Sequence, residues 1–206
     1  MIDLGQPSLF IAAGAILFNP LFWNYIARRE HATRFLSSAC GSPHRACYLL
    51  GAVIFAIGLI RDHLFKQALD NQPSHPLLSH PAIQLLARLA FAAGATLVGS
   101  SMWALGITGT YLGDYCGILM DHVVQGFPFN ITSSPMYSGS TLCFLGTALS
   151  YRSPAGILLT AIVHLVYRIA LSYEDQHLPP TRSQIKTSLD STPDSTICIL
   201  HINWPV

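Results

Sequence analysis

Two side chains that could do chemistry lie in a stretch rich in glycine, proline and tyrosine. Asp114 precedes Tyr115, and Tyr137 lies two residues after Pro135. A carboxylate in such a stretch can accept a proton or contact a polar headgroup, and a tyrosine offers a hydroxyl or a ring face that attracts cations. The alternative for Asp114 is a turn residue at a membrane interface, and for Tyr137 a residue of an interfacial aromatic belt.

The surrounding backbone indicates that these residues line a pocket. Residues 109–141 join two apolar segments, yet they hold many glycine, proline, tyrosine and small hydroxyl residues. Irregular backbone at membrane depth is tolerated only where it lines a protein cavity or lies at the interface. We therefore expect this connection to be buried polar backbone that shapes a site.

The composition favours a membrane protein. Of the 206 residues, 51% are hydrophobic and 10% are charged, whereas a soluble domain carries about 25% charged residues. The formal net charge of +1 offers no basic field for nucleic acid, so we expect no nucleic-acid partner. The five cysteines form no CxxC pair and the nine histidines are scattered, which argues against a metal site.

Four apolar segments predict an all-α integral membrane bundle of three to five membrane-inserted helices. Each is near the roughly 20 residues that a helix needs to cross ~30 Å of hydrocarbon. They occupy about residues 8–27, 46–60, 85–107 and 154–173. Because Asn19-Pro20 interrupts the first segment, a re-entrant or interfacial helix there is as reasonable as a full crossing. We expect one membrane-embedded domain, 1–176, and a polar, flexible tail, 177–206.

A collinear series of motifs resembles a known family. The series runs from about Phe18 to Asp175 and includes FNPLFWN at 18–24, the stretch 104–119, FPFNI at 127–131 and PMYSGST at 135–141. In this order the motifs resemble the phosphatidylethanolamine N-methyltransferases. Such enzymes are integral membrane proteins that methylate a lipid headgroup with S-adenosylmethionine.

The resemblance implies an activity and a location. The lipid partner would be phosphatidylethanolamine in the bilayer, methylated through mono- and dimethyl intermediates to phosphatidylcholine, with S-adenosyl-L-methionine as the methyl donor. The protein would be a multi-pass protein of the endoplasmic reticulum membrane, or of mitochondria-associated membranes. Asp114 and Tyr137 would be the catalytic residues, and no metal is implied. The oligomeric state stays open.

The resemblance also implies cofactor-binding residues. The family's Gly-x-Gly element falls on Ala92, Ala93 and Gly94, so its first glycine is replaced by alanine. The family's acidic pair falls on Glu174 and Asp175, where aspartate keeps the charge but shortens the reach. The alternatives are that small residues in a membrane helix pack against a neighbouring helix and that the acidic pair is a solvated helix end.

Two other functions remain open at this stage. Arg168, an arginine inside an apolar segment, is a site candidate unless it extends to the interface. With the acidic pair it is similar to a pattern of prenylcysteine carboxyl methyltransferases, so a prenylcysteine carboxylate is an alternative acceptor. A catalytically silent membrane scaffold or a small-solute carrier is the alternative from another class.

A shared cofactor constrains the expected topology. A soluble cofactor must reach both Gly94 and Glu174 from one side of the membrane. If Gly94 lies near the start of segment 85–107 and Glu174 just beyond segment 154–173, these two segments must run antiparallel. We therefore predict an antiparallel pair.

Overall fold

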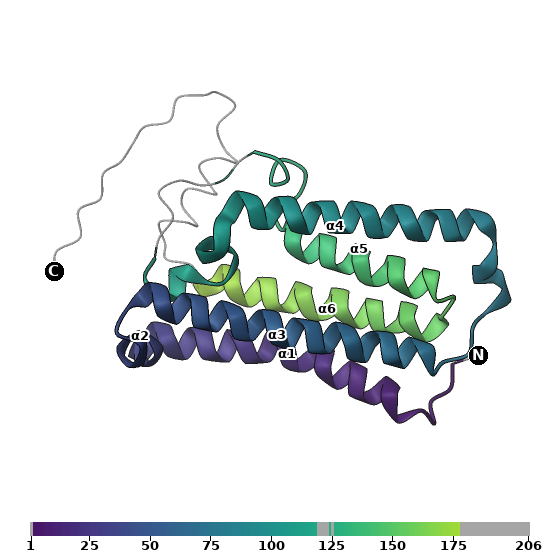
Figure 1. Cartoon of the computed structure of the whole chain (residues 1–206), viewed down its shortest axis with the longest axis horizontal. Coiled ribbons are helices and arrows are strands. Elements are labelled where there is room, and N and C mark those ends of the chain that lie inside the picture. Colours follow the sequence, from purple (N-terminus) through teal and green to yellow (C-terminus); the bar gives the residue numbers. More distant parts are fainter. Residues whose placement is uncertain (1, 119–123, 125, 178–206) are drawn as a thin grey trace. The chain divides into compact units, whose positions relative to one another are not determined.

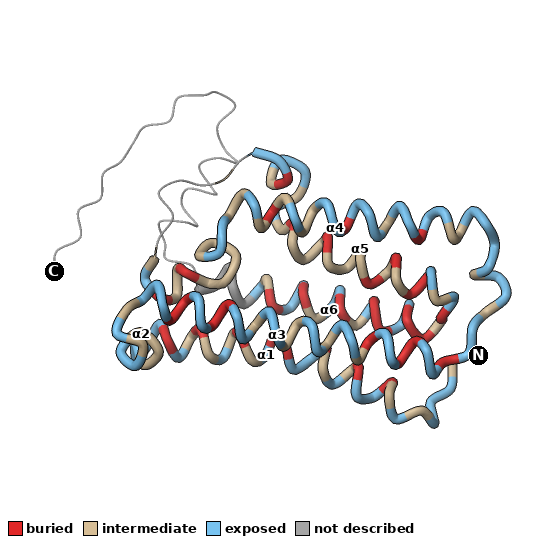
Figure 2. Tube along the Cα trace, viewed as in Figure 1, coloured by how far each residue is buried: buried red, intermediate tan, exposed pale blue. Residues whose placement is uncertain are grey.

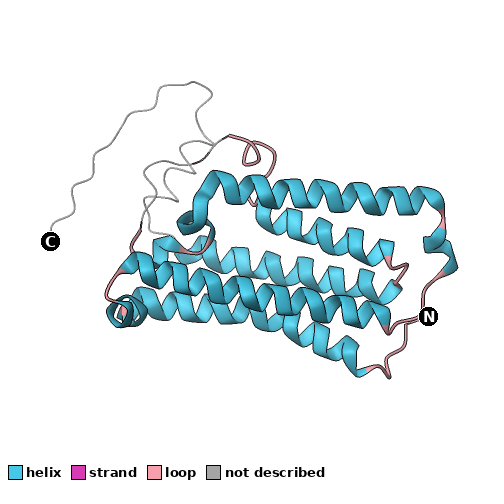
Figure 3. Ribbon diagram, in the orientation of Figure 1, coloured by secondary structure: helices cyan, strands magenta, loops and turns pink. Residues whose placement is uncertain are grey.

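The computed structural model describes residues 2–118, 124 and 126–177, and its elements are all helical (Figures 1 and 3). The helices are α1 (Pro7–Thr33), α2 (Phe35–Cys40), α3 (Pro43–Asp70), η1 (Pro76–Ser79), α4 (Pro81–Thr110), η2 (Gly113–Cys116), α5 (Pro135–Ser150) and α6 (Pro154–His177). The chain divides into two compact units, Met1–Ala170 and Leu171–Val206, and the packing below is that of the first. The predicted tail lies outside the described residues, apart from His177.

A proline opens each of the five long helices. Proline suits the first helical position because its ring presets φ and its missing N–H has no partner there. Serine or histidine precedes four of these prolines; His80 accepts a bond from the first turn of α4, and Ser153 accepts one from Gly156 N–H at 3.2 Å. The prolines are Pro7, Pro43, Pro81, Pro135 and Pro154.

Four helical stretches are long and apolar enough to cross a membrane, which agrees with the predicted all-α membrane bundle. They are Pro7–Thr33, Pro43–Asp70, Pro81–Cys116 and Pro154–Ser172. The first is one continuous helix through Asn19 and Pro20, so no break marks a re-entrant turn. A proline inside a helix leaves one carbonyl without its N–H partner and commonly bends the helix; Figure 1 shows α1 changing direction along its length.

Helix α5 is the element that the apolar segments did not predict. Its sequence, PMYSGSTLCFLGTALS, looks too rich in hydroxyl groups for an apolar helix. The structure hides several of these groups, because hydroxyls donate to the carbonyl four residues earlier in the same helix. Thr141 donates to Tyr137 at 2.9 Å, Thr147 to Cys143 at 2.8 Å, and Ser150 to Gly146 at 2.8 Å.

Helices α4 and α5 touch through small residues. The buried residues of α4, namely Ala87, Gly94 and Ser101, recur every seven positions and form one stripe. A methyl group on Gly94 would lie 2.5 Å from the Gly139 carbonyl oxygen, and one on Gly146 would lie 2.7 Å from the Ala87 carbonyl oxygen. Later residues of α5 thus meet earlier residues of α4, so the two helices are antiparallel.

This pairing overturns the expected topology of segments 85–107 and 154–173. A turn at 151–153 joins α5 to α6, and a methyl group on Gly156 would lie 2.8 Å from the Ala148 Cβ, so these helices are antiparallel as well. Since α5 reverses the chain between them, α4 and α6 run parallel. The predicted antiparallel pair was wrong because α5 was counted as part of an irregular connection.

The core lies between α1, α3, α5 and α6, while α4 contributes little to it (Figure 2). Its buried residues are Leu9, Ala12, Ile16, Trp23, Phe65, Ala68, Leu69, Phe144, Ala148, Ala155, Leu159, Val163 and Tyr167. The outer surface of α4 is apolar, and Trp103 is 91% exposed. A surface of this kind is suited to lipid.

The α4–α5 contact predicts the effect of adding one methyl group. Gly146→Ala places a Cβ 2.7 Å from backbone atoms of Ala87 and Phe91, so we expect a loss of about 1–3 kcal/mol of stability from overpacking. The measurement is the apparent Tm of the purified protein in detergent.

Gly99→Ala on α4 is the matched control. Nothing lies within 4 Å of that Cβ, and alanine favours a helix by about 1 kcal/mol over glycine, so the Tm should be unchanged or higher. Equal Tm values for the two variants would contradict the packing described above.

Candidate functional site

The connection that follows α4 folds back onto the bundle. The helix is interrupted at Gly106, where φ is 64° and ψ is −175°, and positive φ recurs at Leu112 and Gly117. These backbone reversals direct η2 (Gly113–Cys116) toward α1 and α3, which it contacts. Residues 109–118 of the connection are therefore packed against helices, as predicted for irregular backbone at membrane depth. The prediction was wrong for 126–134, where only Pro128 is buried and Phe127 and Ile131 are 51% and 66% exposed.

Small and sulfur-containing residues make the contact with α3. Cys47 and Cys116 are fully buried together with Ala46. The Cys47 thiol donates to the Tyr111 carbonyl oxygen at 3.5 Å. A Cβ on Gly51 would lie 3.0 Å from the Tyr111 ring, so this glycine lets the aromatic side chain lie on α3.

The corner between α1 and α2 is the other part of the bundle that lies near η2. Glu30 is fully buried and its carboxylate accepts bonds from Leu36 N–H at 2.6 Å and Ser37 N–H at 3.1 Å, and from the Ser37 hydroxyl. These bonds satisfy free N–H groups at the start of α2. The charge of Glu30 therefore holds the corner in place, a role that the sequence analysis did not assign.

Charged and aromatic side chains from this corner meet η2. The rings of His31 and Tyr115 lie edge to face with centroids 6.0 Å apart. The Arg34 guanidinium lies against Gly117, where a Cβ would be 2.6 Å from its Nη1. Asp114 is half-buried in η2, and its carbonyl accepts from Gly117 N–H at 3.1 Å. Asp114 thus shares this turn with Tyr115 and Gly117, which contact His31 and Arg34 of the corner.

A buried hydroxyl next to this connection also fits a polar ligand. Thr110, the last residue of α4, has a buried Oγ1 with no hydrogen-bond partner among the described residues. An unsatisfied buried polar group costs about 1–3 kcal/mol. A ligand that bonds to this oxygen would offset that cost.

Tyr137 enters the bundle from a different element. It lies in the first turn of α5 and packs against the main core, as does Leu112 just before η2. Its ring centroid lies 5.0 Å from that of Tyr167 on α6. Tyr137 therefore borders the main core, whereas η2, which carries Asp114, packs through Cys116 against Ala46 and Cys47.

The residues predicted to bind a cofactor divide into two groups. Gly94 is buried against α5, so the helix-packing alternative describes its contacts, whereas Ala92 and Ala93 are exposed on α4. Glu174 and Asp175 lie in the last turns of α6 and belong to the second compact unit. Their cofactor role stays a prediction.

A polar contact beside Tyr137 was not predicted from the sequence. The Tyr167 hydroxyl accepts a bond from Arg61 at 2.7 Å. The signal was available, because Arg61 directly follows the apolar run that ends at Ile60. Arg168, the arginine chosen from the sequence, is exposed instead.

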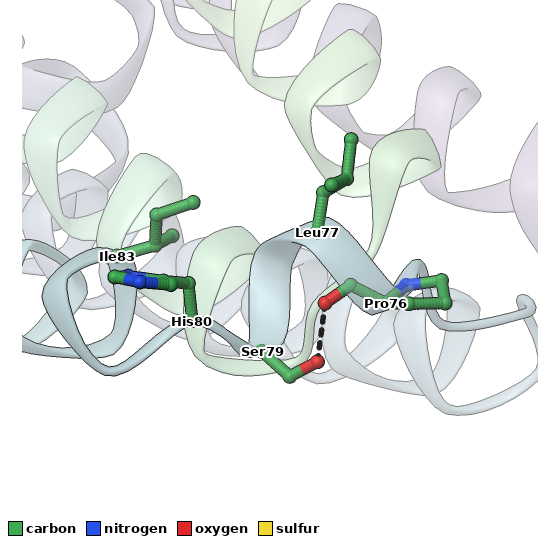
Figure 4. A pocket seen from close by; sticks show the side chains of 5 residues that line it. All are labelled: Pro76, Leu77, Ser79, His80 and Ile83. Atoms are coloured by element: carbon green, nitrogen blue, oxygen red, sulfur yellow. Dashed lines mark hydrogen bonds between the residues drawn. The ribbon is translucent and has the colours of Figure 1, made fainter.

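A shallow hollow at the α3–α4 connection carries no comparable chemistry. It is lined by Pro76, Leu77, Ser79, His80 and Ile83 (Figure 4). The Ser79 hydroxyl donates to the Pro76 carbonyl, and His80 accepts a backbone bond at the start of α4. The polar groups of the hollow thus serve the local turns. The described residues also contain no group of three or more metal-ligating side chains.

Comparison with known proteins gives the family. The phospholipid methyltransferase family model matches residues 83–181. Two fungal proteins, from Neurospora crassa and Emericella nidulans, are named phosphatidyl-N-methylethanolamine N-methyltransferase. They are 55% identical over 175 residues (84% of this chain, 82% of that protein) and 54% identical over 174 residues (84% and 85%). The chain belongs to the phospholipid methyltransferase family.

Other members of the family carry a related name. The Homo sapiens phosphatidylethanolamine N-methyltransferase is 48% identical over 174 residues, which are 84% of this chain and 87% of that protein. No solved structure matches the chain. Membership confirms the resemblance that the motifs indicated and implies that the protein uses a methyl donor.

For a member of this family, the exposure of Ala92 and the burial of Gly94 predict different effects. Ala92→Leu adds bulk to an exposed position, so we expect the KM for the methyl donor to rise about tenfold, about 1.4 kcal/mol, with the Tm unchanged. Gly94→Ala forces a Cβ to 2.5 Å from the Gly139 carbonyl, so we expect a lower Tm and an unchanged donor KM in the folded fraction.

Initial-rate measurements and thermal unfolding of purified Ala92→Leu and Gly94→Ala test these two expectations. A donor KM that stays unchanged in Ala92→Leu would contradict a cofactor role for the exposed face of α4.

Proposed function

We propose that this chain methylates the amine of phosphatidylethanolamine and of its mono- and dimethyl derivatives, and so forms phosphatidylcholine. The observation that carries the proposal is the high identity, over more than four fifths of the chain, to enzymes named for these lipids. A bundle with four candidate membrane spans suits an acceptor that lies in the bilayer. None of the relatives named above is named for a prenylcysteine carboxylate or as a scaffold.

S-Adenosylmethionine is the methyl donor of the proposal, and it supplies an electrophilic methyl group on a sulfonium. Ala92 and Ala93 suit it because their small exposed side chains leave room on α4. Glu174 and Asp175 offer carboxylates to hydroxyl and ammonium groups. Gly94 does not fit a direct contact, because α5 covers the position that its side chain would occupy.

The chain's own residues must handle one proton in each transfer. A protonated amine has no lone pair, so the ammonium must lose a proton before its nitrogen can form the new N–C bond and the S–C bond can break. We assign the acceptor role to Asp114 and a cation-orienting role to Tyr137, whose ring face attracts an ammonium. Positioning contributes much of the rate, because the displacement is in line.

The fungal relatives suggest a narrower alternative. The two reported above are named for the monomethylated lipid and are more similar to this chain than the Homo sapiens relative. A chain that acts only after the first methyl group has been added would match them. We place either activity in the endoplasmic reticulum membrane, with mitochondria-associated membranes as the alternative location.

A lipid methylation assay separates the two activities. Purified protein in vesicles receives radiolabelled S-adenosylmethionine and either phosphatidylethanolamine or its monomethyl derivative, and the lipids are then separated. We expect label in phosphatidylcholine from both acceptors. Label from the monomethyl lipid alone would support the narrower function, and no labelled lipid from either acceptor would contradict both.

The acidic pair predicts a defect specific to the donor. Glu174→Gln removes one charge without changing the shape of the side chain, so we expect the donor KM to rise about tenfold, about 1.4 kcal/mol, with the lipid KM unchanged. Asp70→Asn, at the exposed end of α3, is the control and should leave both KM values unchanged. A donor KM that does not move in Glu174→Gln would remove this residue from the cofactor site.

A further inference from the structure

Arg61 and Asp62 form a polar pair on a candidate membrane-spanning helix. They follow the apolar run of α3 and their side chains are 12% and 51% exposed. The Arg61 Nε and Nη2 donate to the same oxygen, Oδ1 of Asp62, at 3.0 and 2.8 Å. A third bond runs from Arg61 Nη1 to the Tyr167 hydroxyl at 2.7 Å, so the guanidinium is fixed from two helices.

Aromatic rings from three helices lie around the Arg61 guanidinium. The Arg61 guanidinium lies 5.0 Å from the ring centroid of Phe144 on α5, and Phe144 in turn meets Phe65 edge to face at 4.7 Å. Tyr167 on α6 lies 5.0 Å from Tyr137 on α5. The faces of such rings attract cations, so the environment suits a positively charged group even where water is scarce.

The stability of the fold does not explain why Arg61 and Asp62 occupy these positions. Taking an ion pair out of water costs free energy that the mutual attraction often fails to repay, so a well-packed apolar pair would serve the fold as well or better. Ionisable residues inside membrane helices are rare and usually functional. The pair is therefore a candidate for ligand binding.

Both members keep bonding capacity that the described residues do not use. No donor among those residues reaches Oδ2 of Asp62. A guanidinium has five N–H groups, and the three bonds above leave one on each terminal nitrogen of Arg61 without a partner in the described part of the chain. The Arg61 guanidinium can bind an anion and the Asp62 carboxylate can bind a cation, and the two lie side by side. Together they complement the two charges of a zwitterion.

We propose that Arg61 and Asp62 bind the two charges of the zwitterionic phospholipid headgroup. Arg61 binds the phosphate diester and Asp62 binds the ammonium. The inference rests on the proposed function, since it gives the substrate of that reaction its binding residues. Asp62 is a binding residue only. It lies 15 positions along α3 from Cys47, which packs against Cys116 of η2, or about 22 Å at 1.5 Å per residue. A headgroup held by the pair must therefore move along the bundle before Asp114 can accept its proton.

This arrangement also explains how one site can take a series of methylated amines. Each methyl group removes an N–H donor from the headgroup but leaves its positive charge in place. The Asp62 carboxylate attracts that charge whether or not an N–H remains. Substrates, intermediates and product therefore all fit the same pair.

Steady-state kinetics of the full chain in vesicles tests the assignment. With monomethylated phosphatidylethanolamine as acceptor, Asp62→Asn keeps an acceptor oxygen for Arg61 but loses the charge. We expect its lipid KM to rise about tenfold or more, as for a lost charge partner, while the donor KM stays within about twofold. Arg61→Lys, which keeps the charge but loses the fork geometry, should move the lipid KM in the same direction.

The controls are the same substitutions at exposed positions, Asp70→Asn on α3 and Arg88→Lys on α4. Neither should change either KM. If Arg61→Lys fails to fold, Asp62→Asn decides alone, because Asp62 is half-exposed. A lipid KM that stays at the wild-type value in Asp62→Asn would overturn the assignment.

A binding measurement separates failure of this assignment from failure of the proposed function. In detergent, short-chain phosphatidylcholine should raise the Tm of the wild-type protein more than short-chain phosphatidylglycerol, which has the phosphate but no ammonium. Asp62→Asn should abolish that difference. If Asp62→Asn loses the Tm difference but the wild-type protein methylates no lipid, the headgroup site is supported and the proposed function is not. If Asp62→Asn keeps the Tm difference, the headgroup site is wrong, even when the wild-type protein is an active enzyme.

Discussion

Helix α4 packs against α5 so closely that, at two glycines, no side chain larger than a hydrogen atom fits between the helices. At Gly94 and Gly146 the backbones of α4 and α5 approach so closely that a methyl group would meet carbonyl oxygens at 2.5 and 2.7 Å. Lipid tails are as apolar as leucine, so close backbone packing of this kind holds membrane helices together. Because α4 leads directly into η2, the same contact fixes where the connection that carries Asp114 begins.

The second constraint is that polar groups must find partners within the protein. Glu30 caps α2, the hydroxyls of α5 bond to their own helix, and the Cys47 thiol bonds to a carbonyl of the folded-back connection. Three buried oxygens lack a hydrogen-bond partner among the described residues, those of the Asn19, Ser101 and Thr110 side chains. Thr110 is the one beside the folded-back connection, where a polar ligand would satisfy it.

The sequence predicted the membrane bundle, the four apolar helices and the packed first part of the connection, because hydropathy and glycine content determine these features locally. It did not predict that 126–134 would be largely exposed. It did not predict α5, since the hydroxyls of residues such as Thr147 count as polar although the helix satisfies them. That omission reversed the expected direction of α6 relative to α4. The position of Arg61 after an apolar run was visible in the sequence, but its bond to Tyr167 was not, because the two residues are 106 positions apart. The packing role of Gly94 was left as an alternative, since helix contacts are not local in sequence.

The length of α5 has a consequence for the bilayer itself. Its 16 residues rise about 24 Å at 1.5 Å per residue, which is less than the ~30 Å thickness of the hydrocarbon core. Only Ser150 of these residues is exposed, so protein and not lipid covers α5 along its length. The two ends of α5 would then lie below the surface of a bilayer that the longer helices span, and the chain that leaves them would reach the membrane surface only after further residues.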